Sequence, residues 1–226
     1  MRYRSRCVYD GNVTYTHEAP TATESVNSDT LTLTVPVVPA MRAIRALALL
    51  RDTTGTHSAI LGGIAVRAVS GAVTMLATDS YRMGAVTIVT EDSVTPTLDA
   101  AVIPSATVTT LCKTFSRSAV ARLTGSLTVA VTGGAVAVTV GGYHHSEAIQ
   151  LGRFPSVDHI LAEVVEGHGR CQYDAAYLQS VGRVAREWGA PSVVVESSHD
   201  RKPSRFILTA DDGPMMVLLM PQRMTE

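Results

Sequence analysis

Hydrophobic and polar residues alternate along most of this chain, a pattern typical of half-buried antiparallel strands. Glycine-rich or polar turns interrupt the alternation, so each run is predicted to be a separate strand. The predicted strands read LTLTVP, SAILGGIAVRAVS, AVTMLATD, YRMGAVTIVT, AAVIP, VARLTGS, LTVAVTGG, AVAVTVGGYHH, RCQY, SVVVESS, RFILTA and MMVLLMP.

Three stretches carry apolar residues at helical spacing and are predicted to be helices: residues 39–51, 105–118 and 175–188. Pro39 suits a first helical turn, and Ser105 is a candidate N-cap. Asp174 and Gly189 are the expected cap and stop of the third helix. Each helix follows a short strand and precedes several more, which gives three strand–helix–multistrand units about 65–70 residues apart. The predicted class is α+β, with antiparallel sheets and few helices.

The first thirty residues stand apart from these units. Two short alternating runs joined by Asp-Gly-Asn predict a β-hairpin. The polar stretch from Pro20 to Thr30 then predicts a linker.

Composition indicates a globular protein with a substantial core. The chain has 226 residues, of which 46% are hydrophobic and 17% charged, unlike a disordered chain. No apolar run reaches the roughly 18 residues that a membrane span needs, and the N-terminus lacks an apolar signal region. Three cysteines without metal-binding spacing favour a reducing cytoplasm, so no membrane partner is expected and the predicted location is cytoplasmic.

Basic residues gather on the predicted helices although the net charge is only −1. On a helical wheel each helix has one apolar stripe and, opposite it, basic residues with almost no acids. These side chains are candidate contacts to the phosphates of duplex DNA, which would bind without reading sequence. The alternative is that they form ordinary solvated helix faces. The candidate DNA-binding residues are Arg42, Arg45, Lys113, Arg117, Arg183 and Arg186.

No pattern in the sequence indicates catalysis. There is no P-loop, GxSxG or HExxH motif. His144 and His145 are adjacent on a predicted strand, so they face opposite ways and make a poor metal pair. We therefore expect no enzyme activity, no catalytic residues, no metal and no cofactor.

Three short motifs occur in order along the chain. LATDSYRM at residues 76–83 spans a corner between two predicted strands and alone is typical of an Asx- or ST-type turn. GRFPSVDHIL follows at 152–161, and VLLMPQR at 217–223. In this order the motifs resemble those of the bacterial DNA polymerase III beta sliding clamp family. The resemblance covers residues 31–223, loosens after residue 161, and is absent from the first thirty residues.

The resemblance implies a DNA-clamp fold of repeated βαβββ units, with antiparallel sheets outside and helices lining an inner face. It implies a polymerase processivity factor that encircles duplex DNA, is closed by an ATP-hydrolysing clamp loader, and tethers the replicative polymerase. The alternative is a clamp-fold interaction protein that forms no ring but binds polymerase or loader peptides.

The resemblance also implies a peptide-binding pocket between two domains, where the three motifs converge. Ser80 and Tyr81 stand where the family often has Gly and His, which leaves the peptide preference open. The alternative is that the pocket residues are core residues at a domain seam. Carried over by motif, the pocket residues are Leu61, Thr78, Ser80, Tyr81, Arg82, Met83, Pro155, Ile160, Leu218, Met220, Pro221 and Arg223.

The predicted organisation is an N-terminal hairpin and linker at 1–30, a clamp domain of two units at 31–152, and a second, shortened clamp domain at 153–226. Family members close rings of six domains, so a chain counted as two domains predicts a head-to-tail homotrimer. The chain is a short version of the resembled clamps, and its richness in alanine and valine fits a high-GC genome such as that of a phage.

Overall fold

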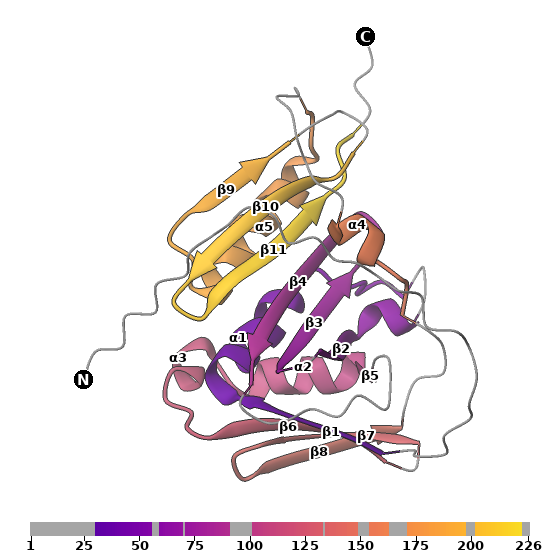
Figure 1. Ribbon diagram of the computed structural model, residues 1–226, viewed down its shortest axis with the longest axis vertical. Coiled ribbons are helices and arrows are strands. Elements are labelled where there is room, and N and C mark those ends of the chain that lie inside the picture. Colours follow the sequence, from indigo (N-terminus) through magenta and orange to yellow (C-terminus); the bar gives the residue numbers. More distant parts are fainter. Residues whose placement is uncertain are drawn as a thin grey trace.

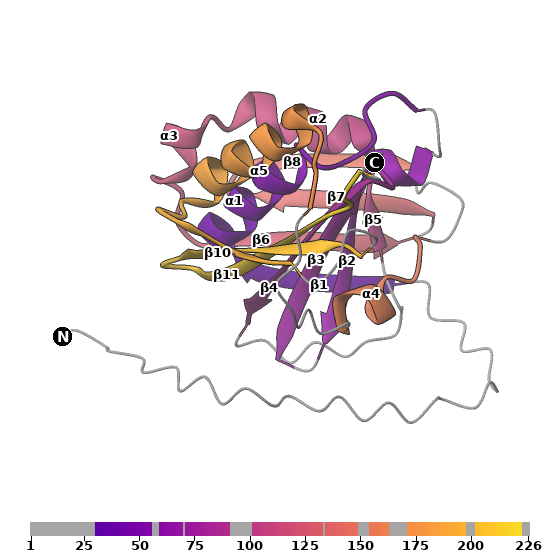
Figure 2. The same ribbon diagram turned by 90° about the horizontal axis from the view of Figure 1, so that it is seen from above.

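The computed structural model describes residues 30–55, 59–69, 71–90, 101–132, 134–148, 154–162, 171–197 and 202–222 (Figure 1). The predicted N-terminal hairpin therefore lies outside the described residues. Two antiparallel sheets form one side of the molecule, and helices α1, α2, α3 and α5 lie together as a layer on the other (Figure 2). The predicted α+β class with antiparallel sheets is confirmed.

The first unit consists of β1 (Thr30–Pro36), α1 (Val37–Leu47), the short 3-10 helix η1 (Ala59–Gly62), β2 (Ile64–Val69), β3 (Ala72–Thr78) and β4 (Arg82–Val89). The second consists of β5 (Ala101–Ile103), α2 (Ser105–Thr114), α3 (Arg117–Val120), β6 (Ser126–Thr132), β7 (Ala135–Val140) and β8 (Tyr143–Ala148). The third contains α5 (Ala175–Trp188), β9 (Val193–Glu196), β10 (Ser204–Ala210) and β11 (Gly213–Leu219), and α4 (Asp158–Ala162) precedes it.

The first two units exchange their leading strands. β1 pairs with β6 of the second unit, and β5 pairs with β2 of the first. The result is a four-stranded sheet of order β1-β6-β7-β8 and a larger sheet that begins β5-β2-β3-β4. The two units are therefore interlocked through their strands.

The third unit extends the larger sheet. β11 pairs antiparallel with β4, which gives a seven-stranded order β5-β2-β3-β4-β11-β10-β9. On the helix side, α5 packs against α1, so the first and third units meet in both layers. We call the line along which β4 meets β11 the seam.

The main core lies between the helix layer and the sheets. α1 is apolar on almost every side, and 7 of its 11 residues are buried, because α2, α3 and α5 flank it while the sheets cover its base. Gly84 of β4 permits this close packing, since a Cβ there would meet Leu50 Cδ1 at 2.6 Å and Leu47 Cδ2 at 2.7 Å.

The third helix forms as the sequence predicts, and its caps explain why. The Asp174 carboxylate accepts hydrogen bonds from the backbone N–H groups of Ala176 at 2.7 Å and Tyr177 at 3.3 Å. Gly189 ends the helix in the left-handed region, at φ 91°. The helix spans 175–188, matching the predicted range.

Several other predicted boundaries are wrong. The run SAILGGIAVRAVS is η1 followed by β2, and the VARLTGS segment contains the end of α3 and a turn before β6. Helix α1 begins and ends earlier than expected, at Val37 and Leu47. The second helix stops at Thr114, its N-cap is Pro104 and not Ser105, and Ser116 caps the short α3. The predicted strand RCQY contributes a single bridge, from Gln172 to Gln222.

Candidate functional site

The corner between β3 and β4 is a tightly hydrogen-bonded turn at one end of the seam. The Asp79 carboxylate accepts from the backbone N–H groups of Tyr81 at 3.0 Å and Arg82 at 2.8 Å. Thr78 Oγ1 accepts from the N–H of Ser80 at 3.1 Å and donates to the carbonyl of Arg82 at 2.7 Å. Ser80 is the one non-glycine residue with positive φ, 77°, among the residues described. These bonds form the Asx- and ST-type turn that the sequence predicts.

An aromatic residue from the third unit holds this turn. Arg82 Nε donates to Asp79 Oδ2 at 2.8 Å, and the guanidinium carbon lies 4.6 Å from the ring centroid of Tyr177 on α5. Tyr81 stacks on the same ring at 6.0 Å. Burial, with the neighbouring Asp79 carboxylate, raises the pKa of Tyr177 above its ordinary value. The corner of the first unit is thus fixed to the helix of the third.

The end of β11 runs beside this corner. Leu218 is the cross-strand partner of Met83, and the N–H of Met220 donates to the carbonyl of Tyr81 at 3.1 Å. The first and third motifs, at residues 76–83 and 217–223, are therefore adjacent in space. Met220 and Tyr81 remain open to solvent, with 40% and 51% of their surface exposed.

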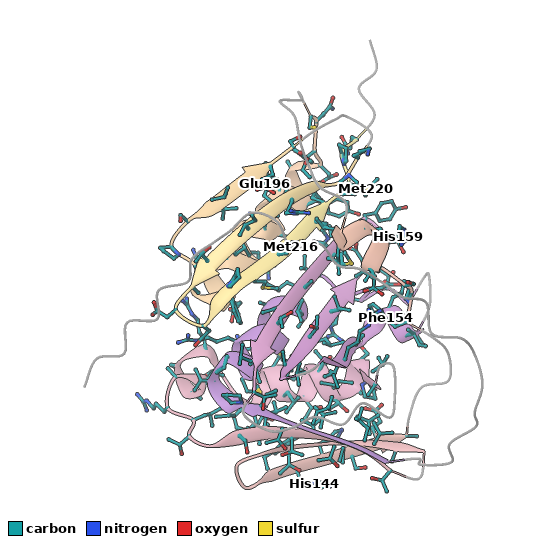
Figure 3. All side chains as sticks on the ribbon, viewed as in Figure 1. His144, Phe154, His159, Glu196, Met216 and Met220 are labelled. Carbon is teal, nitrogen blue, oxygen red and sulfur yellow. The ribbon has the colours of Figure 1, made fainter. Side chains whose placement is uncertain are left out.

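The second motif covers an apolar cluster at the seam. Phe154 and Val157 are buried there with residues from β2, β3, β4, β5, β11 and η1, and Ile160 packs against the edge. An ion pair from Arg67 to Asp158, at 2.7 Å, ties α4 to β2. Figure 3 shows Phe154, Met216 and Met220 along this side of the molecule. We call this group the seam cluster: Ile60, Leu61, Ala65, Leu76, Met83, Val102, Phe154, Val157 and Leu218.

The eleven predicted pocket residues that the structure describes divide by burial into two groups, which we call the floor and the rim. Leu61, Met83 and Leu218 are buried members of the seam cluster, and Thr78 is buried within the turn. The exposed or half-buried residues around them are Ser80, Tyr81, Arg82, Pro155, Ile160, Met220 and Pro221. Arg223 lies outside the described residues, as do Gly152 and Arg153 of the second motif.

Three residues at the seam were not predicted. Phe154 and Val157 belong to the second motif, where their hydrophobicity was a usable signal. Tyr177 carried no such signal, because its position on the predicted helix indicated only a core-facing stripe.

The helix layer presents a surface of one sign. Lys113, Arg117, Arg183 and Arg186 are exposed, and so is Arg122 just after α3. The only acid within α1, α2, α3 and α5 is Glu187, and it is neutralised by an arginine of α1. Every exposed charge on these four helices is therefore positive.

Two of the predicted DNA contacts, Arg42 and Arg45, form ion pairs within the protein. Arg45 Nε donates to Glu187 Oε2 at 2.8 Å, and its NH1 donates to the carbonyls of Cys112 at 3.0 Å and Phe115 at 2.9 Å. Arg42 pairs with Asp212 in the turn between β10 and β11. Arg45 joins α1, the end of α2 and α5, so its first role is structural.

The described residues contain no group of three His, Cys, Asp or Glu side chains placed to hold a metal ion. His144 bonds to Thr139 on the neighbouring strand, at 3.0 Å. Among the helices described, none combines the length and apolar character needed to cross a membrane.

Solved structures similar to this chain include DNA polymerase sliding clamps. A DNA polymerase sliding clamp from Pseudomonas aeruginosa aligns with a TM-score of 0.66 and 14% identity, over 86% of this chain and 67% of that one. The Helicobacter pylori beta clamp, solved with diflunisal, aligns with a TM-score of 0.68 and 10% identity, over 90% of this chain and 69% of that one. The DNA polymerase III beta subunit from Thermotoga maritima gives 0.65 and 9%, over 94% and 69%.

No family model matches the chain, and no curated protein matches it. At 9–14% identity the structural likeness establishes the fold alone. The chain has the clamp fold. Its particular likeness is to the beta subunit of bacterial DNA polymerase III, of which it spans about two thirds of the length.

Proposed function

We propose that this protein is a short DNA sliding clamp, a non-enzymatic processivity factor that encircles duplex DNA and tethers a replicative polymerase in the cytoplasm. The observation that carries the proposal is the meeting of the three motifs at the seam of a clamp fold. The corner of β3 and β4, the segment around Phe154, and the end of β11 are far apart in sequence but adjacent in space.

The seam is suited to bind a short extended peptide of a polymerase or clamp loader. Met220, Tyr81 and Pro155 are exposed apolar residues, and leucine and methionine side chains are buried in the seam cluster beside them in the fold. Methionine is adaptable and makes favourable contacts with aromatic side chains. A peptide with apolar anchors fits this chemistry.

The helix layer is suited to phosphate contact. Lys113, Arg117, Arg183 and Arg186 extend into solvent with no exposed acid among them on the helices. Such contacts hold a duplex in any register, as a protein that slides along DNA requires. We also propose that the protein comes from a phage and is loaded by a clamp loader. The expected stimulation of a polymerase is the same whichever organism and loader supply it.

Primer extension tests this function. The protein, supplied with a polymerase that carries a clamp-binding peptide and with a clamp loader, is expected to lengthen the products made per binding event. Variants with the rim removed should lose this stimulation while still binding DNA. Stimulation that survives loss of the rim would contradict the role given to the seam.

The rival function is a clamp-fold protein that binds the same peptides without surrounding DNA. It is favoured by the unit count, since the described residues form three βαβββ-like units where two full domains need four. Peptide binding without any salt-sensitive DNA binding would support the rival.

A further inference from the structure

The exposed basic residues of the helix layer fall into two groups. Lys113 lies in the last turn of α2, Arg117 begins α3, and Arg122 follows α3. Arg183 and Arg186 lie on α5. All five residues are exposed. We call the first group the α2–α3 ridge and the second group the α5 ridge.

Helix α1 separates the two ridges. It packs against α5 and also against α2 and α3, which lie on opposite sides of it in Figure 1. No residue from Val37 to Leu47 is exposed. Packed helices lie about 8–10 Å apart, axis to axis, so the helices on either side of α1 are about 16–20 Å apart.

The strip between the ridges carries no uncompensated charge. Arg42 of α1 pairs with Asp212, and Arg45 of α1 pairs with Glu187, so these four charges sum to zero. Within the part of the chain that the structure describes, the five ridge side chains form no ion pair. The helix layer therefore presents two strips of unpaired positive charge with a neutral strip between them.

A DNA duplex carries negative charge in a matching arrangement. Its two phosphate strands border a major groove about 12 Å wide, whose floor of base edges carries no net charge. The spacing of the ridges exceeds this width by a few ångströms, which the phosphate groups themselves and the long lysine and arginine side chains can span. A single basic strip would hold one strand, whereas two strips at this spacing can hold both.

We infer that the α2–α3 ridge and the α5 ridge contact the two different strands of one duplex, across its major groove. Arg122 is then a further phosphate contact, beyond the residues that the helical wheel selected. α1 faces the groove between the strands and contacts neither. This inference rests on the proposed function, because it concerns the same DNA-binding surface, and it adds which strand each part of that surface holds.

Arg122 is tested by Arg122→Gln in the full-length chain, with binding to a short linear duplex followed by fluorescence anisotropy over a series of salt concentrations. The slope of log affinity against log salt should become shallower by about 0.9, the value for one phosphate contact. Lys202→Gln is the matched control, because Lys202 is exposed but precedes β10 and is not on the helix layer; its slope should not change. The rival role for Arg122 is to stabilise the end of α3 by its charge. A lower melting temperature with an unchanged slope would establish that role and overturn the assignment.

The assignment of one strand to each ridge is tested with two duplexes of the same sequence. One is ordinary DNA, and in the other one strand carries uncharged methylphosphonate linkages. Arg183→Gln with Arg186→Gln removes the α5 ridge and should weaken binding to the ordinary duplex at least about tenfold at low salt. On the half-neutral duplex the one charged strand can meet only one ridge at a time, so the same variant should lose at most about twofold. Both residues are exposed, so the melting temperature should not change.

Equal losses on the two duplexes would overturn the inference, since both ridges would then follow the same strand. Unchanged binding to the ordinary duplex would also overturn it, and so would a variant that unfolds, because the α5 ridge would then serve the fold. Primer extension is measured separately on the same proteins. Stimulation of a polymerase together with equal losses refutes the assignment of strands alone, whereas the expected losses without any stimulation refute the proposed function alone.

Discussion

Replacement of Arg45 by alanine is expected to lower the free energy of unfolding by more than it lowers the free energy of DNA binding. Its side chain is only 18% exposed, and that of its partner Glu187 only 20%. The same guanidinium also bonds two carbonyls at the end of α2, Cys112 and Phe115, where helix carbonyls otherwise lack partners. The variant leaves one carboxylate and two carbonyls without their charged donor.

The loss in the free energy of unfolding depends on the Glu187 carboxylate and the two carbonyls that stay largely buried without a donor. Breaking a largely buried ion pair costs about 3–5 kcal/mol, and a lost hydrogen bond to a charged group alone costs about 1.5–3 kcal/mol. Because water can reach part of this pair, we expect a loss of about 3 kcal/mol in the free energy of unfolding. For a chain of this size that corresponds to about 6–12 °C in melting temperature.

Urea denaturation of Arg45→Ala, Glu187→Gln and the double variant measures the coupling between the two side chains. Strongly non-additive losses are expected, because both single variants break the same ion pair. Lys113→Ala is the matched control, since its side chain is exposed. An Arg45→Ala variant with wild-type stability, and with DNA affinity reduced as much as in Lys113→Ala, would refute the structural role.

Three further outcomes are expected. Lys113→Glu with Arg183→Glu should weaken DNA binding regardless of sequence and flatten the plot of log affinity against log salt by about 0.9 for each phosphate that is no longer neutralised; an unchanged slope would indicate solvated helix faces. Tyr81→Ala with Met220→Ala should abolish binding of a polymerase C-terminal peptide in calorimetry with little change in melting temperature, because both side chains are exposed; unfolding would mean that they serve as core. Gly63→Ala should cost about 1–3 kcal/mol in urea denaturation, because a Cβ there would lie 2.5 Å from Val102 Cγ1 and 2.6 Å from the carbonyl of Ile103; wild-type stability would show that the backbone can shift.

Local signals predicted the fold where they were strong. Alternation located most of the strands, and the Asp174 cap with the Gly189 stop located α5 to the residue. The run SAILGGIAVRAVS was wrongly predicted to be one strand. Its apolar residues and two glycines have no clear periodicity, so the sequence does not distinguish a 3-10 helix from a strand there. The pairing of β11 with β4 could not be predicted from local sequence patterns, because the two strands are far apart in the chain.

The candidate site was predictable in its motifs and not in its contacts. The three motifs meet at the seam, yet Tyr177 joins them from a helix with no motif of its own. The helical wheel placed Arg42 and Arg45 opposite the apolar stripe, and it could not show that other elements pack on that face as well. A wheel assumes one buried side, which holds at the edge of a helix layer and fails for α1 at its centre.

The predicted trimer depends on how the units are counted. It took the region after residue 153 as a whole domain, whereas the structure describes one βαβββ-like unit there. Three copies with three described units each would bring nine units, whereas the expected six-domain ring would hold twelve. Whether a ring of this protein can close therefore depends on how many copies it contains.

Topological linkage to DNA tests the clamp proposal most directly. The protein is loaded on a nicked circular duplex by a clamp loader with ATP, and the complex is then washed with high salt, which weakens phosphate contacts. The proposal predicts that the protein stays on the circle through the wash and is lost once a restriction enzyme makes the DNA linear. Equal loss from circular and linear DNA would contradict encirclement and favour the interaction protein that forms no ring.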